Sequence, residues 1–195
     1  AVEPAPEYVL LFSDRFVSSP DMSRGITDGR WKYIRNFEPD RPRFQMLAYP
    51  LYQPGQLSQV REYQAGRTNS MQSAFFLPQP YEELYDTQAD PYEIENLAGL
   101  SQHANKLELM RQELDIKLLE ARDAGFIPEP MMANIDQYSS TTLYDFCQSS
   151  RDYHLAEILE FANKAVQKNV DMIPELIANL KHKDPIMRYW AILGL

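Results

Sequence analysis

Few residues in this chain have the types and spacing that catalysis or metal binding requires. His103, His154 and His182 lie far apart in the sequence, and none has a second histidine or an aspartate at metal-ligand spacing. Glu82 and Glu83 resemble a catalytic acid pair. Neighbouring residues of a strand point to opposite faces, however, so these two carboxyls cannot share a proton. The sequence therefore predicts no catalytic residue and no metal ligand in this chain, and we interpret the histidines as helix-surface residues.

Cys147 is the one cysteine of the chain, which excludes an internal disulfide and a multi-cysteine metal site. It does not fix the compartment, because a single thiol is compatible with reducing and oxidising surroundings. We interpret the Met131–Met132 and Phe75–Phe76 pairs as packing residues.

Composition predicts a folded, acidic protein. The 195 residues are 44% hydrophobic and 12% aromatic, which is enough to build a core. The net charge of −9 argues against nucleic acid or an anionic membrane as a partner, because phosphate binding needs a basic face. No apolar run of about 18 residues is present to span a membrane. Both ends read as cut from a longer protein.

The first part of the chain predicts a small antiparallel sheet. The continuous apolar run 8–12 is typical of a strand covered on both faces. The segments 23–27 and 31–37 flank Asp28–Gly29, a dipeptide suited to a two-residue hairpin turn. Residues 82–86 predict a further strand. Prolines make regular structure unlikely over 38–56, and a short helix is expected over 57–66.

Residues 101–124 give the clearest helical pattern. Apolar residues recur along one stripe: Ala104, Leu107, Met110, Leu114, Leu118 and Ala121. Ser101 is the predicted N-cap, and Gly125 is expected just after the C-cap. The fold class that follows is α+β, a small antiparallel sheet packed by one long C-terminal amphipathic helix.

The composition changes after this helix. Residues 127–150 are rich in Pro, Met, Ser and Thr and predict a connector or extended wrap. Helices are expected over 152–168, 173–180 and from Pro185 onward, with Pro174 and Pro185 in first turns, where proline is tolerated. Short helices with tight turns indicate a truncated HEAT-like repeat. The predicted domains are 1–126, 127–150 and 151–195.

Three stretches carry a resemblance to a known family. They are Arg24 to Phe37 (RGITDGRWKYIRNF), Glu82 to Ala98 (EELYDTQADPYEIENLA) and Gly125 to Glu129 (GFIPE). In this order and spacing they resemble the C-terminal subdomain of type I sulfatases of the heparan N-sulfatase and arylsulfatase-like branch. The resemblance covers about residues 7–130. The segment 184–195 resembles the HEAT-type extension of some bacterial sulfatases.

The resemblance implies a catalytic apparatus outside this chain. These sulfatases cleave sulfate esters or sulfamates with a formylglycine made from a cysteine in a Cys-x-Pro-x-Arg context, beside a divalent cation, usually calcium held by aspartates. Cys147 and Arg151 have the spacing of that motif, but Ser149 stands where proline or alanine is usual. The pair also follows the subdomain instead of lying near the start of the protein. We therefore expect no cofactor here, and calcium and formylglycine only in the parent enzyme.

The same resemblance suggests three substrate-binding candidates. Asp14 and Arg15 follow the first strand, where related sulfatases carry an Asp-Arg cluster at the pocket rim, and Gln79 precedes the 82–86 strand in a loop that can reach the rim. Arg15 could pair bidentately with a sulfate or a uronate. A surface or interdomain salt bridge is the open alternative for these residues.

The function that these observations predict is the non-catalytic C-terminal portion of a sulfatase acting on sulfated carbohydrate, which completes the fold and walls the substrate pocket. Its expected partner is the N-terminal catalytic domain of the same chain, in a periplasmic or extracellular setting. The isolated chain is expected to be inactive and to self-associate through an exposed apolar sheet face. The alternative is a protein-interaction module built on helical repeats with no catalytic role.

Overall fold

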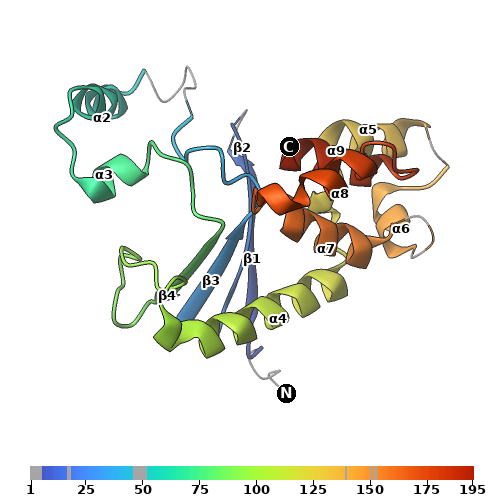
Figure 1. Cartoon of the computed structure of the whole chain (residues 1–195), viewed down its shortest axis with the longest axis horizontal. Helices are drawn as coiled ribbons and strands as arrows, with labels where there is room; N and C mark the ends of the chain where they lie inside the picture. Colours follow the sequence, from blue (N-terminus) through green and yellow to red (C-terminus); the bar gives the residue numbers. More distant parts are fainter. Residues whose placement is uncertain (1–5, 17–18, 46–51, 139, 150, 152) are drawn as a thin grey trace. The chain divides into compact units, whose positions relative to one another are not determined.

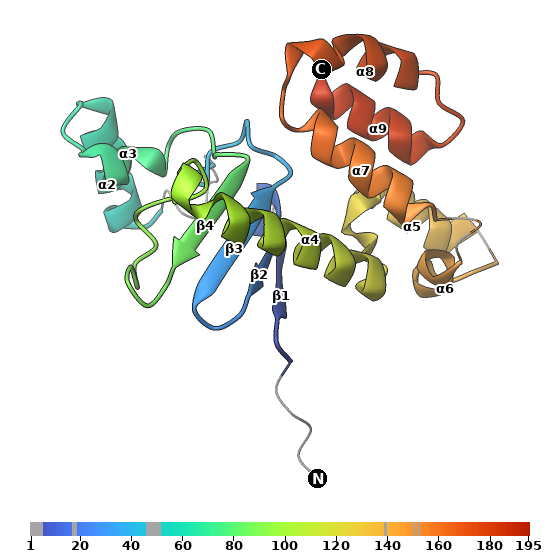
Figure 2. The ribbon, with the colours of Figure 1, turned by 60° about the horizontal axis from the view of Figure 1, so that its bottom comes forward.

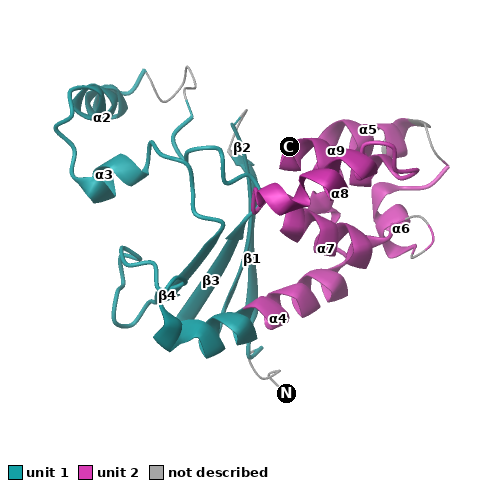
Figure 3. Ribbon diagram, in the orientation of Figure 1, with its two compact units in different colours: residues 1–110 teal, residues 111–195 magenta. Residues whose placement is uncertain are grey.

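The computed structural model describes residues 6–16, 19–45, 52–138, 140–149, 151 and 153–195. Over these residues the chain forms two compact units, 1–110 and 111–195 (Figure 3). The long helix α4 (Ala104–Ala121) runs through the boundary between them. The predicted domains 1–126, 127–150 and 151–195 were drawn from changes in sequence composition. Their bounds differ from those of the two units, and they stay a prediction.

Unit 1 is built on a four-stranded antiparallel sheet with the strand order β1-β2-β3-β4 (Figure 1). The strands are β1 (Val9–Phe16), β2 (Ser19–Thr27), β3 (Trp31–Asn36) and β4 (Glu82–Asp86). A sheet in one part of the chain and helices in the other make the fold α+β, which confirms the predicted fold class.

The β2–β3 hairpin forms as predicted, but its turn lies one residue later. Asp28 N–H donates to the Trp31 carbonyl at 3.2 Å, so Gly29 and Arg30 are the central residues. Gly29 has a φ of 90°, which suits glycine at the first central position. Asp28 Oδ1 accepts the N–H groups of Arg30 and Trp31 at 3.0 and 2.6 Å. The aspartate therefore caps the turn instead of occupying its centre.

Asp28 makes one contribution to stability that depends on pH. Burial alone would raise the pKa of its carboxyl, but the donors Trp31 N–H and Arg30 N–H and the Lys106 ammonium lower it below 3.8 in the balance. An acid whose pKa is lower in the native state than in the unfolded state stabilises the fold at pH values above its unfolded pKa. This stabilisation is lost as the pH falls through the native pKa. We expect Asp28→Asn to keep the turn while removing this part of the acid destabilisation. Urea unfolding between about pH 3 and pH 7 checks this; an acid limb identical to that of the wild type contradicts it.

The prediction that residues 8–12 form a strand covered on both faces is wrong in its second part. The strand exists, but β1 lies at the edge of the sheet and pairs with β2 alone among the described strands. Phe12 is 74% exposed and Val9 48% exposed. A continuous apolar run indicates a strand, but burial depends on what the fold stacks over it. Self-association through these side chains stays a prediction.

The core of unit 1 centres on three residues in register across the sheet. Ile26, Tyr33 and Leu84 lie opposite one another on β2, β3 and β4, and all are fully buried. The Trp31 ring lies 5.4 Å from the His103 ring and 5.7 Å from Lys106 Nζ. The start of α4 thus packs beside the β2–β3 turn.

The long helix is confirmed in the middle of its stripe but not at its ends, since Ala104 and Ala121, the first and last residues of the predicted stripe, are exposed. Leu107, Met110, Leu114 and Leu118 are buried. The α-helix begins at Ala104, after the 3-10 turn η1 (Ser101–His103), and the cap position before that turn is Leu100, so Ser101 is not the N-cap. It ends at Ala121, where Arg122 and not Gly125 takes the positive φ, of 53°. The Arg122 guanidinium holds this conformation by donating to the carbonyls of Cys147 and Tyr153 at 2.6 and 3.2 Å.

Two short helices fill the proline-rich stretch between β3 and β4. They are α2 (Pro54–Gln64) and α3 (Ser70–Ala74). Phe76 stacks on Tyr63 with ring centres 4.4 Å apart, and it also contacts Phe44 and Phe75. The predicted helix over 57–66 is therefore present but begins earlier, at Pro54, where proline suits the first turn.

Unit 2 is all helical in the described residues. After the 3-10 turn η2 (Ala124–Phe126) come α5 (Glu129–Tyr138), α6 (Leu143–Gln148), α7 (Leu155–Ala165), the 3-10 turn η3 (Val170–Met172), α8 (Ile173–Asn179) and α9 (Pro185–Gly194). The extended wrap predicted over 127–150 is wrong, because α5 and α6 occupy most of it. Pro185 opens α9 behind the N-cap Asp184, as the sequence indicates.

The core of unit 2 forms where α9 packs against α7 and α8 (Figure 2). Trp190 is 1% exposed, and its Nε1 donates to the Phe126 carbonyl at 3.0 Å. Gly194 allows close approach, because a Cβ there would lie 2.8 Å from Leu176 Cδ2 and 3.0 Å from Ala165 Cβ. No described helix is long and apolar enough to cross a membrane.

Replacing Gly194 by alanine is expected to destabilise unit 2 by about 1–3 kcal/mol through overpacking, despite the better helix propensity of alanine. Gly55→Ala in α2 is the matched control, since a Cβ there meets nothing within 4 Å. That change should be neutral or add about 0.5 kcal/mol. Urea unfolding followed by far-UV circular dichroism compares the two, and equal effects would contradict the packing explanation.

Candidate functional site

Asp14, the first predicted site residue, lies at an irregularity of the β1–β2 ladder. Ser13 pairs with Ser23 and Arg15 with Pro20, so two residues of β2 oppose Asp14. Such bulges change the direction of side chains. Asp14 Oδ1 accepts Arg24 Nη2 at 2.7 Å, and Arg24, which is 1% exposed, also donates to the carbonyls of Ser13 and Ser23. Asp14 thus serves to neutralise a buried guanidinium.

Gln79 is a buried crosslink between two loops and β2. Its Nε2 donates to Asp21 Oδ1 at 2.8 Å and to the Arg41 carbonyl at 3.1 Å. Its backbone N–H donates to the Pro39 carbonyl at 2.8 Å. With 8% exposure, Gln79 mainly positions its neighbours.

Glu38 pairs with Arg41, whose backbone carbonyl accepts from Gln79, and the charge of Arg15 also acts on the Glu38 carboxyl. Its carboxylate lies 3.5 Å from Arg41 and accepts the Met22 N–H at 3.4 Å. Burial raises the pKa of Glu38, and the charges of Arg41 and, more weakly, Arg15 oppose that rise. We call Arg15, Asp21, Glu38, Arg41 and Gln79 the rim cluster. Gln79 belongs to it through hydrogen bonds and Arg15 only through the effect of its charge on Glu38, whereas Asp14 is engaged with Arg24.

Sequence reasoning missed three members of the rim cluster: Asp21, and the pair Glu38 and Arg41. Their three-residue spacing places two opposite charges within reach of each other in a tight turn, and the Arg41 N–H indeed donates to the Glu38 carbonyl at 3.0 Å. That spacing was the available signal. Arg41 keeps a 41% exposed side chain and Arg15 is exposed, so the cluster presents guanidinium groups at the surface.

The adjacent acids Glu82 and Glu83 point to opposite faces, as predicted, and each has structural partners. Glu82 accepts the Tyr33 hydroxyl. Glu83, 3% exposed, accepts Asn36 Nδ2 at 2.7 Å, Arg43 Nη2 at 2.6 Å and the Tyr85 hydroxyl at 2.5 Å. Burial raises the pKa of both tyrosines, so they act as neutral donors. This network fixes β3, β4 and the loop after β3.

Cys147 does not have the surroundings of a reactive centre. It is buried in α6, and burial raises the pKa of its thiol, which favours the unreactive protonated form. Among the described residues no group of three or more His, Cys, Asp or Glu side chains is placed to hold a metal ion.

The chain thus contains an α+β unit, which carries the rim cluster with its surface arginines, and an all-helical unit. No family model matches the chain. Over 128 residues it is 34% identical to an ulvan-active sulfatase of Formosa agariphila, a match that covers 65% of this chain and 22% of the relative. The chain is therefore a distant relative of part of a sulfatase, and it spans about a fifth of the length of that protein.

Proposed function

We propose that this chain is the non-catalytic C-terminal portion of a type I sulfatase, where it completes the fold and walls one side of the substrate pocket. The observation that carries the proposal is the 128-residue similarity to part of a sulfatase. The described residues supply ion pairs, caps and packing but no nucleophile in reactive surroundings. A calcium ion and a formylglycine would then belong to the N-terminal domain of the same protein.

The substrate that we propose for the parent enzyme is a sulfated carbohydrate. The relative is named for its action on ulvan. The rim cluster supports an anionic substrate, because Arg15 and Arg41 can present planar pairs of donors to a sulfate or carboxylate. Enzymes that meet such polymers work in the periplasm or outside the cell, and we propose that setting here.

The test compares the native protein with this chain. An antibody against the chain should detect a band far above 22.7 kDa in extracts of the source organism. The purified native protein should release sulfate from a sulfated polysaccharide, while the 195-residue chain should be inert with or without calcium. Calcium-dependent release by the chain alone would overturn the non-catalytic role. A native band at 22.7 kDa would overturn its place in a larger enzyme.

Arg15→Gln in the native protein should lower kcat/KM for the polysaccharide about tenfold, since one charge-assisted contact to an anion is lost. The thermal midpoint should stay within about 2 °C, because the side chain is exposed. Arg61→Gln on α2 is the matched control, an exposed arginine that loses the same charge away from the rim cluster. Equal kcat/KM for both variants and wild type would remove Arg15 from the substrate site.

A second candidate function, a helical interaction module, is favoured by one feature of unit 2. Four apolar side chains at helical spacing are exposed on and next to α8: Val170 before the helix, Ile173 and Ile177 within it, and Leu180 just after it. An apolar stripe of this kind is how one helical repeat covers its neighbour. In this reading, α7, α8 and α9 begin a HEAT-like array that binds another protein. Sulfate release by the native protein separates the two functions, because an array of further repeats would also give a larger band but would release no sulfate.

A further inference from the structure

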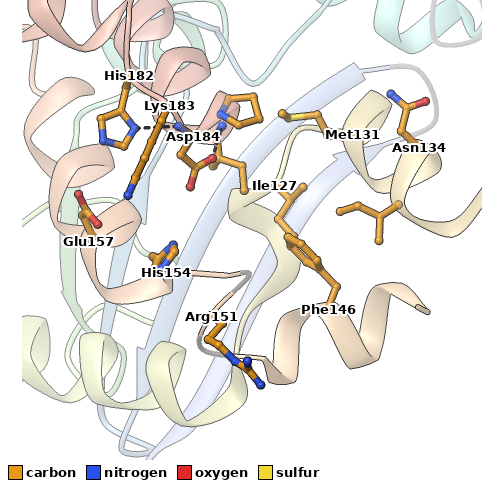
Figure 4. A pocket seen from close by; sticks show the side chains of 13 residues that line it. Ile127, Met131, Asn134, Phe146, Arg151, His154, Glu157, His182, Lys183 and Asp184 are labelled. Carbon is orange, nitrogen blue, oxygen red and sulfur yellow. Dashed lines mark hydrogen bonds between the residues drawn. The ribbon is translucent and has the colours of Figure 1, made fainter. Parts of the chain in front are cut away.

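Unit 2 contains a hollow of about 610 Å³ among its described residues (Figure 4). It is lined by side chains of α5, α6, α7 and α9 and of the segments that precede α5, α7 and α9. Sites for small molecules usually have volumes of about 300–1,000 Å³. The hollow therefore has room for a small organic molecule.

One side of the hollow is apolar. Ile127 and Ile186 are buried at its floor, and Met131, Ile135 and Phe146 are partly exposed around it. Unbranched methionine and the aromatic ring adapt to apolar guests of different shape. This side suits a hydrocarbon or aromatic body.

The other side is polar, where His154, Glu157, His182 and Lys183 gather (Figure 4). His182 Nδ1 accepts the Asp184 N–H at 3.1 Å. A neutral His182 ring therefore carries its proton on Nε2, which is a donor. Structure alone thus brings together two histidines that are far apart in the sequence.

The charges around the hollow favour an anion. Lys183 and Arg151 are exposed cations of the lining, and Glu157 is an exposed acid. The Asp184 carboxylate already accepts the Ile186 N–H at 2.8 Å, at the positive end of the ten-residue helix α9. The formal charges of these four side chains sum to zero, so the positive end of α9 and the His182 Nε2–H donor are what favour an anion beside Lys183.

We propose that this hollow binds an amphipathic organic anion, with a carboxylate beside Lys183 and His182 and an apolar body against Met131 and Phe146. The juxtaposition of apolar side chains with the Lys183 ammonium, the His182 Nε2–H donor and the positive end of α9 carries the assignment. It is independent of the proposed sulfatase role, since every residue involved lies in unit 2 and none belongs to the rim cluster.

The first test titrates the 195-residue chain with octanoate, octanol and octyltrimethylammonium, which share an apolar body and differ in charge. The reporter is the Met131 methyl signal in ¹³C-methyl-methionine NMR spectra, assigned with Met131→Leu. Octanoate should shift this signal saturably and bind about ten times more tightly than octanol, with the cation weakest. Equal affinities, or no saturable shift with octanoate, would overturn the proposal.

Variants then separate the polar and apolar sides by isothermal titration calorimetry. Lys183→Glu should remove the preference for octanoate over octanol, whereas Lys181→Glu makes the same charge change on an exposed lysine outside the lining and should keep it. Met131→Trp should fill the hollow and weaken both probes about tenfold or more while far-UV circular dichroism stays native. Equal losses in the two lysine variants, or full octanoate binding in a folded Met131→Trp, would overturn the assignment.

Discussion

Replacing Trp190 by alanine is expected to lower the free energy of unfolding of unit 2 by about 3–5 kcal/mol. The side chain is 1% exposed, lies 5.8 Å from the Phe126 ring and donates its Nε1–H to the Phe126 carbonyl. Alanine would leave a cavity where α9 packs on its neighbours and would remove the hydrogen bond to the Phe126 carbonyl. Urea unfolding followed by far-UV circular dichroism measures the loss.

Two further variants identify the cause of that loss. Trp190→Phe keeps most of the volume and removes the indole donor, so a loss of about 1–3 kcal/mol is expected. Ile192→Ala removes apolar atoms from the same helix at a 65% exposed position and should change stability by less than about 0.5 kcal/mol. If Ile192→Ala costs as much as Trp190→Ala, loss of core packing at Trp190 does not explain the effect.

The second large effect is expected at Glu83. Glu83→Ala should destabilise unit 1 by about 3–5 kcal/mol, because it removes the shared acceptor of Asn36, Arg43 and Tyr85 from a buried position. Hydrogen exchange read by mass spectrometry assigns the loss to a unit. Peptides covering β3 and β4 should exchange faster, and peptides covering α7 should be unchanged.

Matched variants make the Glu83 result specific. Glu83→Gln keeps an acceptor for Asn36 and Tyr85 but loses the ion pair with Arg43, so an intermediate loss is expected. Glu95→Ala deletes the same atoms at an exposed position and should be nearly neutral. A Glu83→Ala protein as stable as Glu95→Ala would show that the network contributes nothing net to folding.

Local patterns predicted the elements of this fold well. The hairpin around Asp28–Gly29, the strand 82–86 and the stripe from Leu107 to Leu118 depend on neighbours two to four positions apart in sequence. Backbone geometry repeats at those spacings, so the sequence carries the signal directly.

Element ends and burial were predicted less well, because distant residues decide them. Arg122 ends α4 in a left-handed conformation because its guanidinium meets carbonyls about 25 to 31 residues later. Phe12 reads as a core residue, yet it is exposed on an edge strand. The stretch that becomes α5 and α6 reads as a connector, since its polar and proline-rich composition hides its helical turns.

The sequence by itself determined the fold class, the absence of a recognisable nucleophile motif and the relation to part of a sulfatase, because these depend on local periodicity and on residues in a fixed order. Only the tertiary structure decided which polar side chains act together. It engages Asp14 with the buried Arg24, links Gln79 to Asp21 and Arg41, and places His154 and His182 around one hollow. Chain folding brings such residues together across long sequence separations, and no local pattern records those distances.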